Sequence, residues 1–373
     1  MKHFLMGCMI ICILCMQTGS IKAATADDVI DELDISELNR FLEDREEMPV
    51  TFEDVLRALV DTKEIPYEKL GDYIKDRICM QFQENKALIL KLLIISVAFS
   101  LLKNYAKEFS CSYISEICFF LCYCFMMILL LQSFSVMNET VLKTTDDMVA
   151  FMKVLIPVYC GAISFTLNFN ASAATYSIIF AAIYLVEWMM RYLLVPFVKI
   201  YVILEFLNHL MEEERFKRLA ELIASAVKVL LKIAVSFVLG MNIIQGMIAP
   251  AMDKLAENTI TKTMQMIPGI GNVMSGMGQI FLTSGLMIKN CLGATALVIL
   301  VILCAVPFLK MAVLAVLYKF LAAVLEPIAD KRLSGGMNGI ANGGMLYLKI
   351  ISTCLMMFFL SIALSSVATG LGG

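Results

Sequence analysis

The sequence predicts an all-α protein, a polytopic transmembrane helical bundle, and three observations support this prediction. Of the 373 residues, 60% are hydrophobic and 17% are charged, and the mean hydropathy is +0.81. Soluble domains are typically about 45–50% apolar and about 25% charged. Long apolar runs follow one another after the first quarter of the chain. Finally, these runs contain a faint internal duplication, as in transporters and channels built from two related halves.

The duplication consists of short motifs that recur in the same order. Recurrence of Pro and Lys by composition alone is the alternative explanation. The shared order and the slowly increasing spacing favour a true repeat, and we expect membrane repeats at 137–250 and 251–373. The matches are 156–157 with 267–268, 195–199 with 306–310, 217–219 with 331–333, and 231–233 with 348–350, at spacings of 111, 111, 114 and 117.

The first 26 residues predict a secretory signal peptide. Lys2 supplies a positive charge, and Phe4 to Met16 is an apolar run too short to span a bilayer. Ala24-Thr25-Ala26 is a small-residue cleavage site. An uncleaved first membrane helix is the alternative.

Residues 27–86 predict a small acidic helical domain on the extracytoplasmic side. They hold 18 Asp/Glu against 8 Lys/Arg, a net charge of −10. Leu38 and Leu42 belong to an apolar stripe at helical spacing. Thr51 and Asp54 resemble a capping box at the start of a second helix. About sixty residues bury only a marginal core, so we expect this domain to lean on the membrane body or on a partner.

Membrane helices are predicted from residue 87 onward, beginning with two in 87–136. The stretches 174–210 and 292–325 are about 34 to 37 residues long, whereas one crossing needs about 20. Each is broken near its middle by a proline, so it is interpreted either as a tight helical hairpin or as one long kinked span. Eight to ten crossings are expected. The ten-crossing hairpin model is favoured because it places eight of twelve basic loop residues inside the cell. Hairpins would make the repeats parallel, and single spans would make them inverted.

The segment 264–289 is apolar but rich in Gly, Ser, Asn and Gln. A backbone in lipid must satisfy its own hydrogen bonds, so this segment needs protein or water around it. It is interpreted either as a re-entrant, pore-lining element or as an interfacial helix.

No catalytic constellation, cofactor motif or metal site is predicted, and we expect the chain not to be an enzyme. There are only two histidines, and residues 268–271 lack the spacing and the lysine of a phosphate loop. Charges in membrane helices are costly and often functional. Candidate pore or repeat-interface residues are Pro157, Pro196, Lys199, Pro268, Gly269, Gly271, Gly276, Pro307 and Lys310, and candidate intramembrane charges are Glu187, Arg191 and Glu205.

Two pairings and one glycine pattern complete the candidates. Glu187 with Arg191, and Glu205 with His209, stand at i,i+4, so each pair could neutralise itself on one helix face. The ladder of Gly335, Gly339 and Gly343 would allow close helix approach. A flexible cytosolic loop is favoured for this ladder, because asparagines interrupt it and a proline precedes it.

The chain resembles the stage III sporulation protein AE family of endospore-forming bacteria. The residues that carry the resemblance are 263–269 (TMQMIPG), 284–290 (SGLMIKN), 305–310 (AVPFLK) and 318–327 (YKFLAAVLEP). The resemblance implies a multi-pass protein of the mother-cell membrane around the forespore. It also implies membership of a multi-protein channel between the two cells, with an ATPase and ring-forming proteins as partners, and with membrane lipid but no nucleic acid. A stand-alone secondary transporter or permease for a small solute is the alternative.

Overall fold

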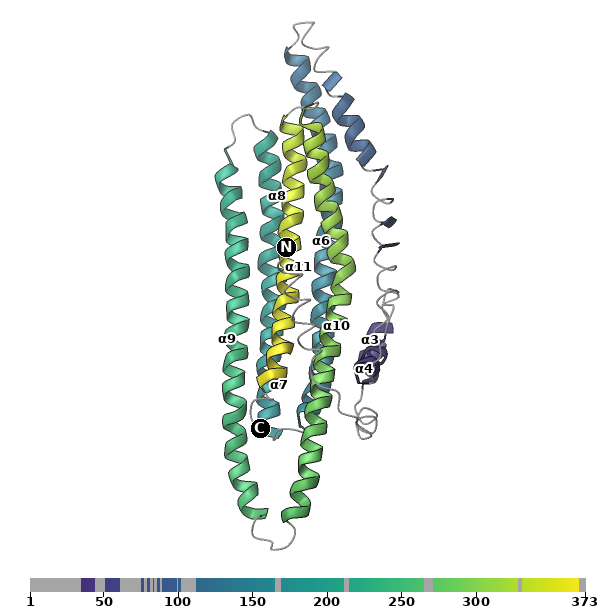
Figure 1. The fold of residues 1–373 in the computed structure, drawn as a ribbon. Helices are drawn as coiled ribbons and strands as arrows, with labels where there is room; N and C mark the ends of the chain where they lie inside the picture. Colours follow the sequence, from purple (N-terminus) through teal and green to yellow (C-terminus); the bar gives the residue numbers. More distant parts are fainter. Residues whose placement is uncertain are drawn as a thin grey trace.

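The computed structural model describes residues 35–43, 51–60, parts of 75–101, 112–164, 169–210, 215–264, 271–327 and 331–368. All regular secondary structure within these ranges is helical, as the sequence predicts. Most of it lies in a bundle of very long helices, drawn in Figure 1. The elements of this bundle are α6 (Ser112–Ser164), α7 (Phe169–Met189), η1 (Met190–Leu194), α8 (Val195–Leu210), α9 (Lys217–Met264), α10 (Gly271–Leu325) and α11 (Lys331–Ala368).

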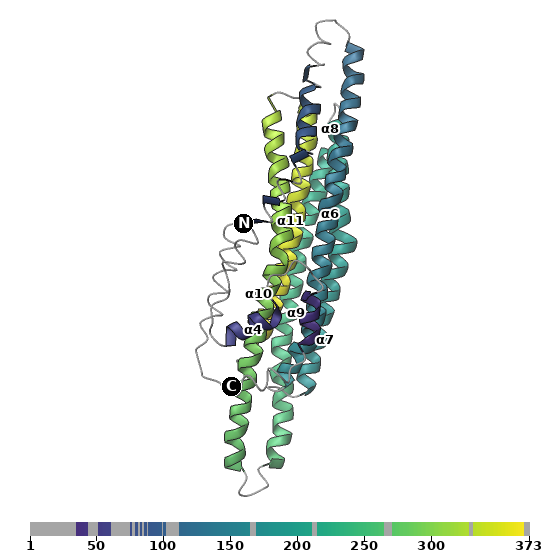
Figure 2. The ribbon, with the colours of Figure 1, turned by 90° about the vertical axis from the view of Figure 1, so that its right-hand side faces the viewer.

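The long helices run up and down the bundle in alternation (Figure 1). The first, α6, descends, and α7, η1 and α8 together ascend as one rod. The remaining three, α9, α10 and α11, then descend, ascend and descend, and a view from another side shows the same order (Figure 2). At 1.5 Å per residue, the 55 residues of α10 extend about 80 Å, well beyond the thickness of a bilayer core.

Within the described residues, five helices are long and apolar enough to cross a membrane. The chain is therefore a multi-pass membrane protein. The hairpin interpretation of 174–210 and 292–325 was wrong. Both stretches are single continuous rods, Ser177–Leu210 and Asn290–Leu325.

The proline in each rod adjusts the helix without ending it. The turn before Pro196 is a π-helical turn, in which the N–H of Val195 donates to the carbonyl of Met190. A wider turn makes room for a ring that would clash with the preceding turn of a regular α-helix. Pro307 lies inside α10, which continues on both sides of it. Proline in an apolar run thus indicated a local distortion here, not a reversal of the chain.

The helix α6 continues without a break past residue 136, where the sequence was expected to end a membrane helix. The polar residues that follow are accommodated within the helix. The hydroxyls of Thr144 and Thr145 donate to the carbonyls of Thr140 and Val141, one turn earlier. Because a helix can satisfy polar side chains in this way, the polar stretch does not interrupt it.

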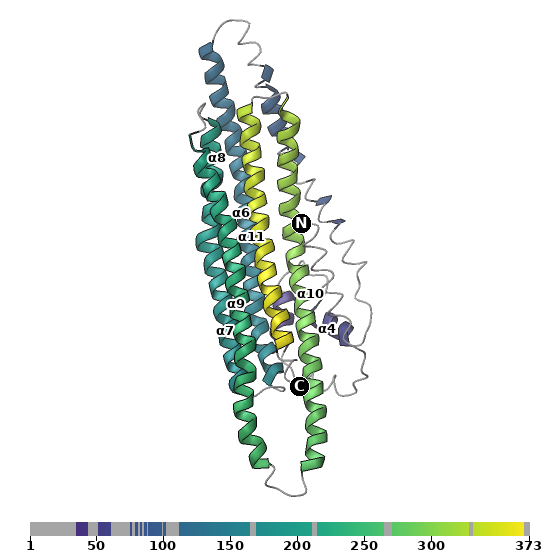
Figure 3. The same ribbon diagram turned by 60° about the vertical axis from the view of Figure 1, so that its left-hand side comes forward.

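The last helix, α11, is the centre of the bundle. It packs against α10, α9, α6 and α8, and has a smaller contact with α7. It is also the most buried of the five candidate spans, at 61% of its apolar window. In Figure 3 it lies between α9 and α10, behind which α6 and α8 are visible.

The sequence repeat corresponds to two helical hairpins, one made of α7–α8 with α9 and the other of α10 with α11. Lys217 is the first residue of α9, and its repeat partner Lys331 is the first residue of α11. Both helices begin at the same end of the bundle and run in the same direction (Figures 1 and 3). The motifs matched at 195–199 and 306–310, and at 217–219 and 331–333, therefore lie on helices that run in the same direction (Figure 1).

Two short helices from the acidic region pack against the side of the bundle. These are α3 (Ser36–Glu43), which contacts α6, and α4 (Phe52–Val60), which contacts α10. The predicted capping box is present: the N–H of Asp54 donates to Thr51 Oγ1 at 3.1 Å, and the N–H of Thr51 donates to Asp54 Oδ2 at 3.3 Å. Leu38 and Leu42 are buried, and the ring of Phe41 lies 6.1 Å from that of Phe151 in α6.

Candidate functional site

The predicted repeat-interface residues do not converge on one site. Lys199 is exposed on α8, and Lys310 is half-buried on α10. The main neighbours of α8 are α11 and α9, whereas those of α10 are α11 and α6, so α11 lies between the two lysines. Pro157 is exposed near the end of α6. Lys199 and Lys310, which match in the sequence repeat, thus lie on corresponding helices but do not contact each other.

The four candidates predicted in the segment 264–289 lie at and before the start of α10. Pro268 and Gly269 lie outside the described residues. Gly271 is the first residue of α10, and Gly276 lies in its first turns. From Gly271 onward the segment is part of one continuous helix, so the structure does not contain a separate re-entrant element over 271–289.

The intramembrane charges pair between helices, and the expected Glu187–Arg191 pair on one helix face was wrong. Lys153 Nζ in α6 lies 2.8 Å from Glu187 Oε2 in α7, and 4.7 Å from the centre of the Tyr184 ring. Arg191 in η1 pairs with Asp146 of α6 at 3.4 Å. Both pairs connect the rod of α7 and α8 to α6, close to the π-helical turn.

The Glu205–His209 pair is present, and it lies beside the glycine ladder. The imidazole Nδ1 is 3.7 Å from Glu205 Oε2 and 2.7 Å from the Glu205 carbonyl. Both side chains are partly buried, at 20% exposure for Glu205 and 26% for His209. Tyr201, one turn before Glu205, has both Glu205 and Asn342 as hydrogen-bonding neighbours.

The glycine ladder is helical and packed, so the favoured interpretation as a flexible loop was wrong. Gly335, Gly339 and Gly343 face α8 at His209, Glu205 and Val202 in turn. A Cβ added at Gly339 would lie 3.0 Å from the Cβ of Glu205, and one at Gly343 would overlap a methyl of Val202. Small residues at four-residue spacing allow two helices to approach this closely in a membrane. We call this contact the α8–α11 seam.

Buried polar side chains hold the other helix contacts together. Each is a single polar residue in an apolar helix whose partner lies far away in the sequence. Sequence reasoning did not single these residues out, because such a residue carries no sign of which helix it will meet. The bonds are Tyr123 Oη to the Phe206 carbonyl (2.7 Å), Tyr347 Oη to Asn138 Oδ1 (2.9 Å), Asn242 Nδ2 to Ser361 Oγ (3.1 Å), and Tyr318 to Ser133.

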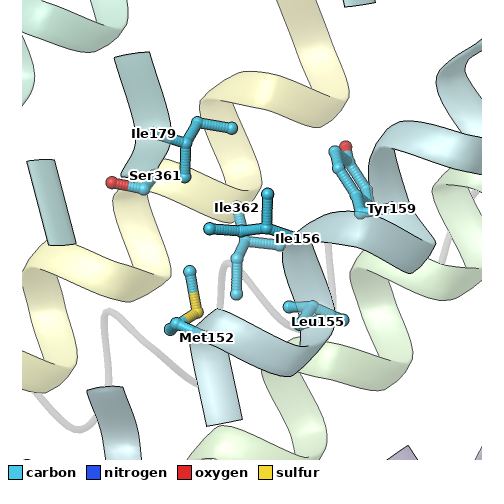
Figure 4. A pocket seen from close by; sticks show the side chains of 7 residues that line it. All are labelled: Met152, Leu155, Ile156, Tyr159, Ile179, Ser361 and Ile362. Carbon is cyan, nitrogen blue, oxygen red and sulfur yellow. The ribbon is translucent and has the colours of Figure 1, made fainter. Parts of the chain in front are cut away.

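A small apolar cavity lies where α6, α7 and α11 meet. Figure 4 shows its lining, in which the hydroxyl of Ser361 points away from the other side chains. This orientation agrees with the bond from Asn242 in α9. The cavity therefore presents hydrocarbon and no convergent polar groups, which a solute site would need for specificity. Its lining is Met152, Leu155, Ile156, Tyr159, Ile179, Ser361 and Ile362.

No arrangement for metal chemistry is present in the described part of the chain. No three His, Cys, Asp or Glu side chains there are grouped so that they could hold a metal ion. The described cysteines, such as Cys304 and Cys354, are free thiols, and these two are buried. What the described residues offer is packing, ion pairs such as Lys153–Glu187 and Arg191–Asp146, and buried hydrogen bonds.

Comparisons with known proteins identify the family. The stage III sporulation protein AE family matches residues 50–369. A protein of Bacillus subtilis (strain 168) named stage III sporulation protein AE is 23% identical over 288 residues, which cover 77% of this chain and 72% of that protein. No solved structure gives a significant match. The family match spans most of the chain, including α4 and all the long helices, and so the chain belongs to the stage III sporulation protein AE family and has a role in sporulation.

Proposed function

We propose that this chain is a non-enzymatic membrane subunit of a transport channel that links the mother cell and the forespore. The mother-cell membrane around the forespore is its proposed location, with an ATPase and ring-forming proteins as partners. One observation carries the proposal: the axis of the bundle is occupied by α11, whose glycines fit tightly against α8. A bundle whose centre is filled in this way suits a component of a larger assembly. In such an assembly, any passage for a transported molecule lies between subunits.

The charge distribution supports an orientation for this subunit. Basic residues gather at the end of the bundle where α9 and α11 begin: Arg215, Lys217, Arg218, Lys331 and Arg332. By the positive-inside rule this end faces the cytoplasm. The acidic helices α3 and α4 lie on the side of the bundle, farther from this basic end (Figures 1 and 2).

A solute transporter is the second candidate, and the repeat of motifs on helices that run in the same direction is the observation that favours it. Transporters bind substrate at the interface between repeats, often beside unpaired charges. Here Glu187 is neutralised by Lys153, and Lys199 and Lys310 lie on helices separated by α11. The described residues therefore offer no shared coupling site, and we favour the assembly role.

Co-purification in mild detergent from sporulating cells tests the assembly role. The tagged full-length chain should retain an ATPase and ring-forming proteins in defined ratio. A seam variant, Gly343→Leu, should lose these partners, whereas Gly240→Leu should keep them because its Cβ meets nothing within 4 Å. A homo-oligomer free of other proteins would contradict the proposal.

A charge-removal variant separates the two candidates. Lys199→Met with Lys310→Met should leave partner recovery and spore formation unchanged if the subunit acts by assembly. Normal partner recovery with loss of spore formation would instead favour a transporter that uses these lysines.

A further inference from the structure

Three exposed lysines lie on neighbouring parts of α9 and α11, and the bundle does not neutralise them. Lys228 and Lys232 are exposed on α9, and Lys349 is exposed on α11. The two helices pack side by side and are joined by the bond between Asn242 and Ser361, so the three lysines lie on adjacent stretches of helix. None of the three has an ion-pair partner among the described residues. The carboxylates in the middle of the bundle are engaged elsewhere, as in the Lys153–Glu187 and Arg191–Asp146 pairs.

The lysines share one depth in the bundle. Counted back from the Asn242–Ser361 bond that joins the two helices, Lys228 and Lys232 lie 14 and 10 residues earlier in α9 and Lys349 lies 12 residues earlier in α11. These separations are about 21 Å, about 15 Å and about 18 Å along the helices. The repeat makes Lys232 and Lys349 equivalent. Beyond Lys349, residues 350–368 contain no charge and extend about 28 Å, close to the thickness of a hydrocarbon core.

Aromatic residues occur at a similar depth on a third helix. The single tryptophan, Trp188, is 56% exposed, and Tyr192 is 68% exposed. They precede the end of α8 by 22 and 18 residues, or about 33 Å and about 27 Å. Trp and Tyr concentrate where headgroups meet hydrocarbon. Trp188 and Tyr192 are thus residues of the kind that contact lipid headgroups, on a helix near these lysines.

An apolar stripe leads away from the lysines along α9. Ile233, Phe237 and Ile244 follow at helical spacing and are 57%, 51% and 54% exposed. This face lies on the other side of the bundle from α3 and α4 (Figures 1 and 3). A cationic cluster continued by an exposed hydrocarbon stripe is complementary to a molecule with an anionic head and apolar chains.

We propose that Lys228, Lys232 and Lys349 form a binding site for the phosphate of an anionic membrane phospholipid. The ammonium groups of α9 and α11 bind the headgroup phosphate, and one acyl chain lies along Ile233, Phe237 and Ile244. Bound phosphate joins the last helix of one repeat to that of the other. Basic sites between transmembrane helices bind anionic headgroups in this manner.

Lipid titration of the full-length protein in detergent, followed by native mass spectrometry, tests this site. The probes are dioleoyl phosphatidylglycerol, dioleoyl phosphatidylcholine and inorganic phosphate. Each lysine contributes about fivefold to the binding of an anionic headgroup. The double variant Lys228→Gln with Lys349→Gln should therefore bind phosphatidylglycerol about thirty-fold more weakly, and Lys228→Arg with Lys349→Arg should retain binding.

The matched control removes two exposed lysines elsewhere, Lys143→Gln with Lys319→Gln. It should change binding less than threefold, and phosphatidylcholine should bind weakly to every variant. Equal loss in the control would assign the effect to net charge and overturn the site, as would unchanged binding in the double variant. Displacement of phosphatidylglycerol by 10 mM inorganic phosphate would show a site for free anions and overturn the lipid as its ligand.

Discussion

Single glycines set the distance between α8 and α11. At Gly335, Gly339 and Gly343 a side chain of α8 occupies the space where a Cβ would lie. Helices in lipid gain no hydrophobic free energy by associating, so close van der Waals contact must supply much of the stabilisation. A one-carbon addition at the seam therefore has a larger effect than the same addition on an open helix face.

The substitution Gly343→Ala is expected to destabilise the bundle. Its Cβ would overlap a methyl of Val202, a β-branched side chain with little freedom to move aside. Overpacking of this kind costs about 1–3 kcal/mol, which should lower the thermal unfolding midpoint in detergent. The control Gly240→Ala adds a methyl with nothing within 4 Å, and should be neutral or stabilising because Ala favours the helix. Equal midpoints for the two variants would contradict the close contact.

Asn242 and Ser361 are expected to stabilise the α9–α11 contact as a pair. Each is buried, and the bond between them is 3.1 Å long. A double-mutant cycle with Asn242→Ala and Ser361→Ala should give a coupling free energy of about 0.6 kcal/mol, as for hydrogen bonds between membrane helices. If the stability losses of the two single variants simply add in the double variant, the bond between the two side chains contributes no coupling free energy. The pair Thr145→Ala and Ser361→Ala, with no mutual contact, provides the reference.

At the scale of elements, two ion pairs fasten the rod of α7 and α8 to α6. The change Lys153→Met leaves Glu187 without its partner and should lower stability by about 1 kcal/mol. The charge swap Lys153→Glu with Glu187→Lys should restore most of that loss, because the pair is recreated in reverse. Protein yield and the unfolding midpoint are the measurements. Failure of the swap would show that Lys153 acts through the Tyr184 ring, 4.7 Å away, and not through the carboxylate.

Element positions were more predictable from the sequence than the way in which the elements join. The capping box at Thr51 and the apolar stripe of α3 were correctly identified, because both are local patterns. The continuity of α6 was missed because its polar residues find partners that no local pattern reveals. Asn138 bonds Tyr347, which is 209 residues away, and Asp146 meets Arg191. Similarly, prolines 196 and 307 were interpreted as turns because a single sequence does not distinguish a distorted helix from a reversal.

At the scale of the whole molecule, the helices that carry the matched motifs run in the same direction, and this orientation can be tested directly. In a cysteine-free background, Arg215→Cys and Lys331→Cys should react with an impermeant thiol reagent from the same side of the membrane. Gly161→Cys, exposed near the other end of α6, should react from the opposite side. Inverted repeats would instead place positions 215 and 331 on opposite sides.

The candidate site was less predictable than the fold. Composition and the repeat identified a membrane bundle and its equivalent lysines, but not which charges are neutralised. Glu187 and Arg191 stand one turn apart on one rod, yet each pairs with α6. The glycine ladder was undervalued because the proline before it suggested a loop. Its role depends on Val202, Glu205 and His209, which a different helix supplies.

The central position of α11 also has a consequence for biogenesis. This helix leaves the ribosome after the other long helices, yet it contacts each of them. Until α11 is inserted, the face of α8 that carries Glu205 and His209 has no glycine-lined helix to pack against. During the same period, α10 lacks its principal neighbour. The earlier helices must therefore wait in the membrane as a loosely packed intermediate. Chains that terminate before Lys331 should remain in this state and be removed by proteolysis, so the bundle is completed only when α11 is inserted.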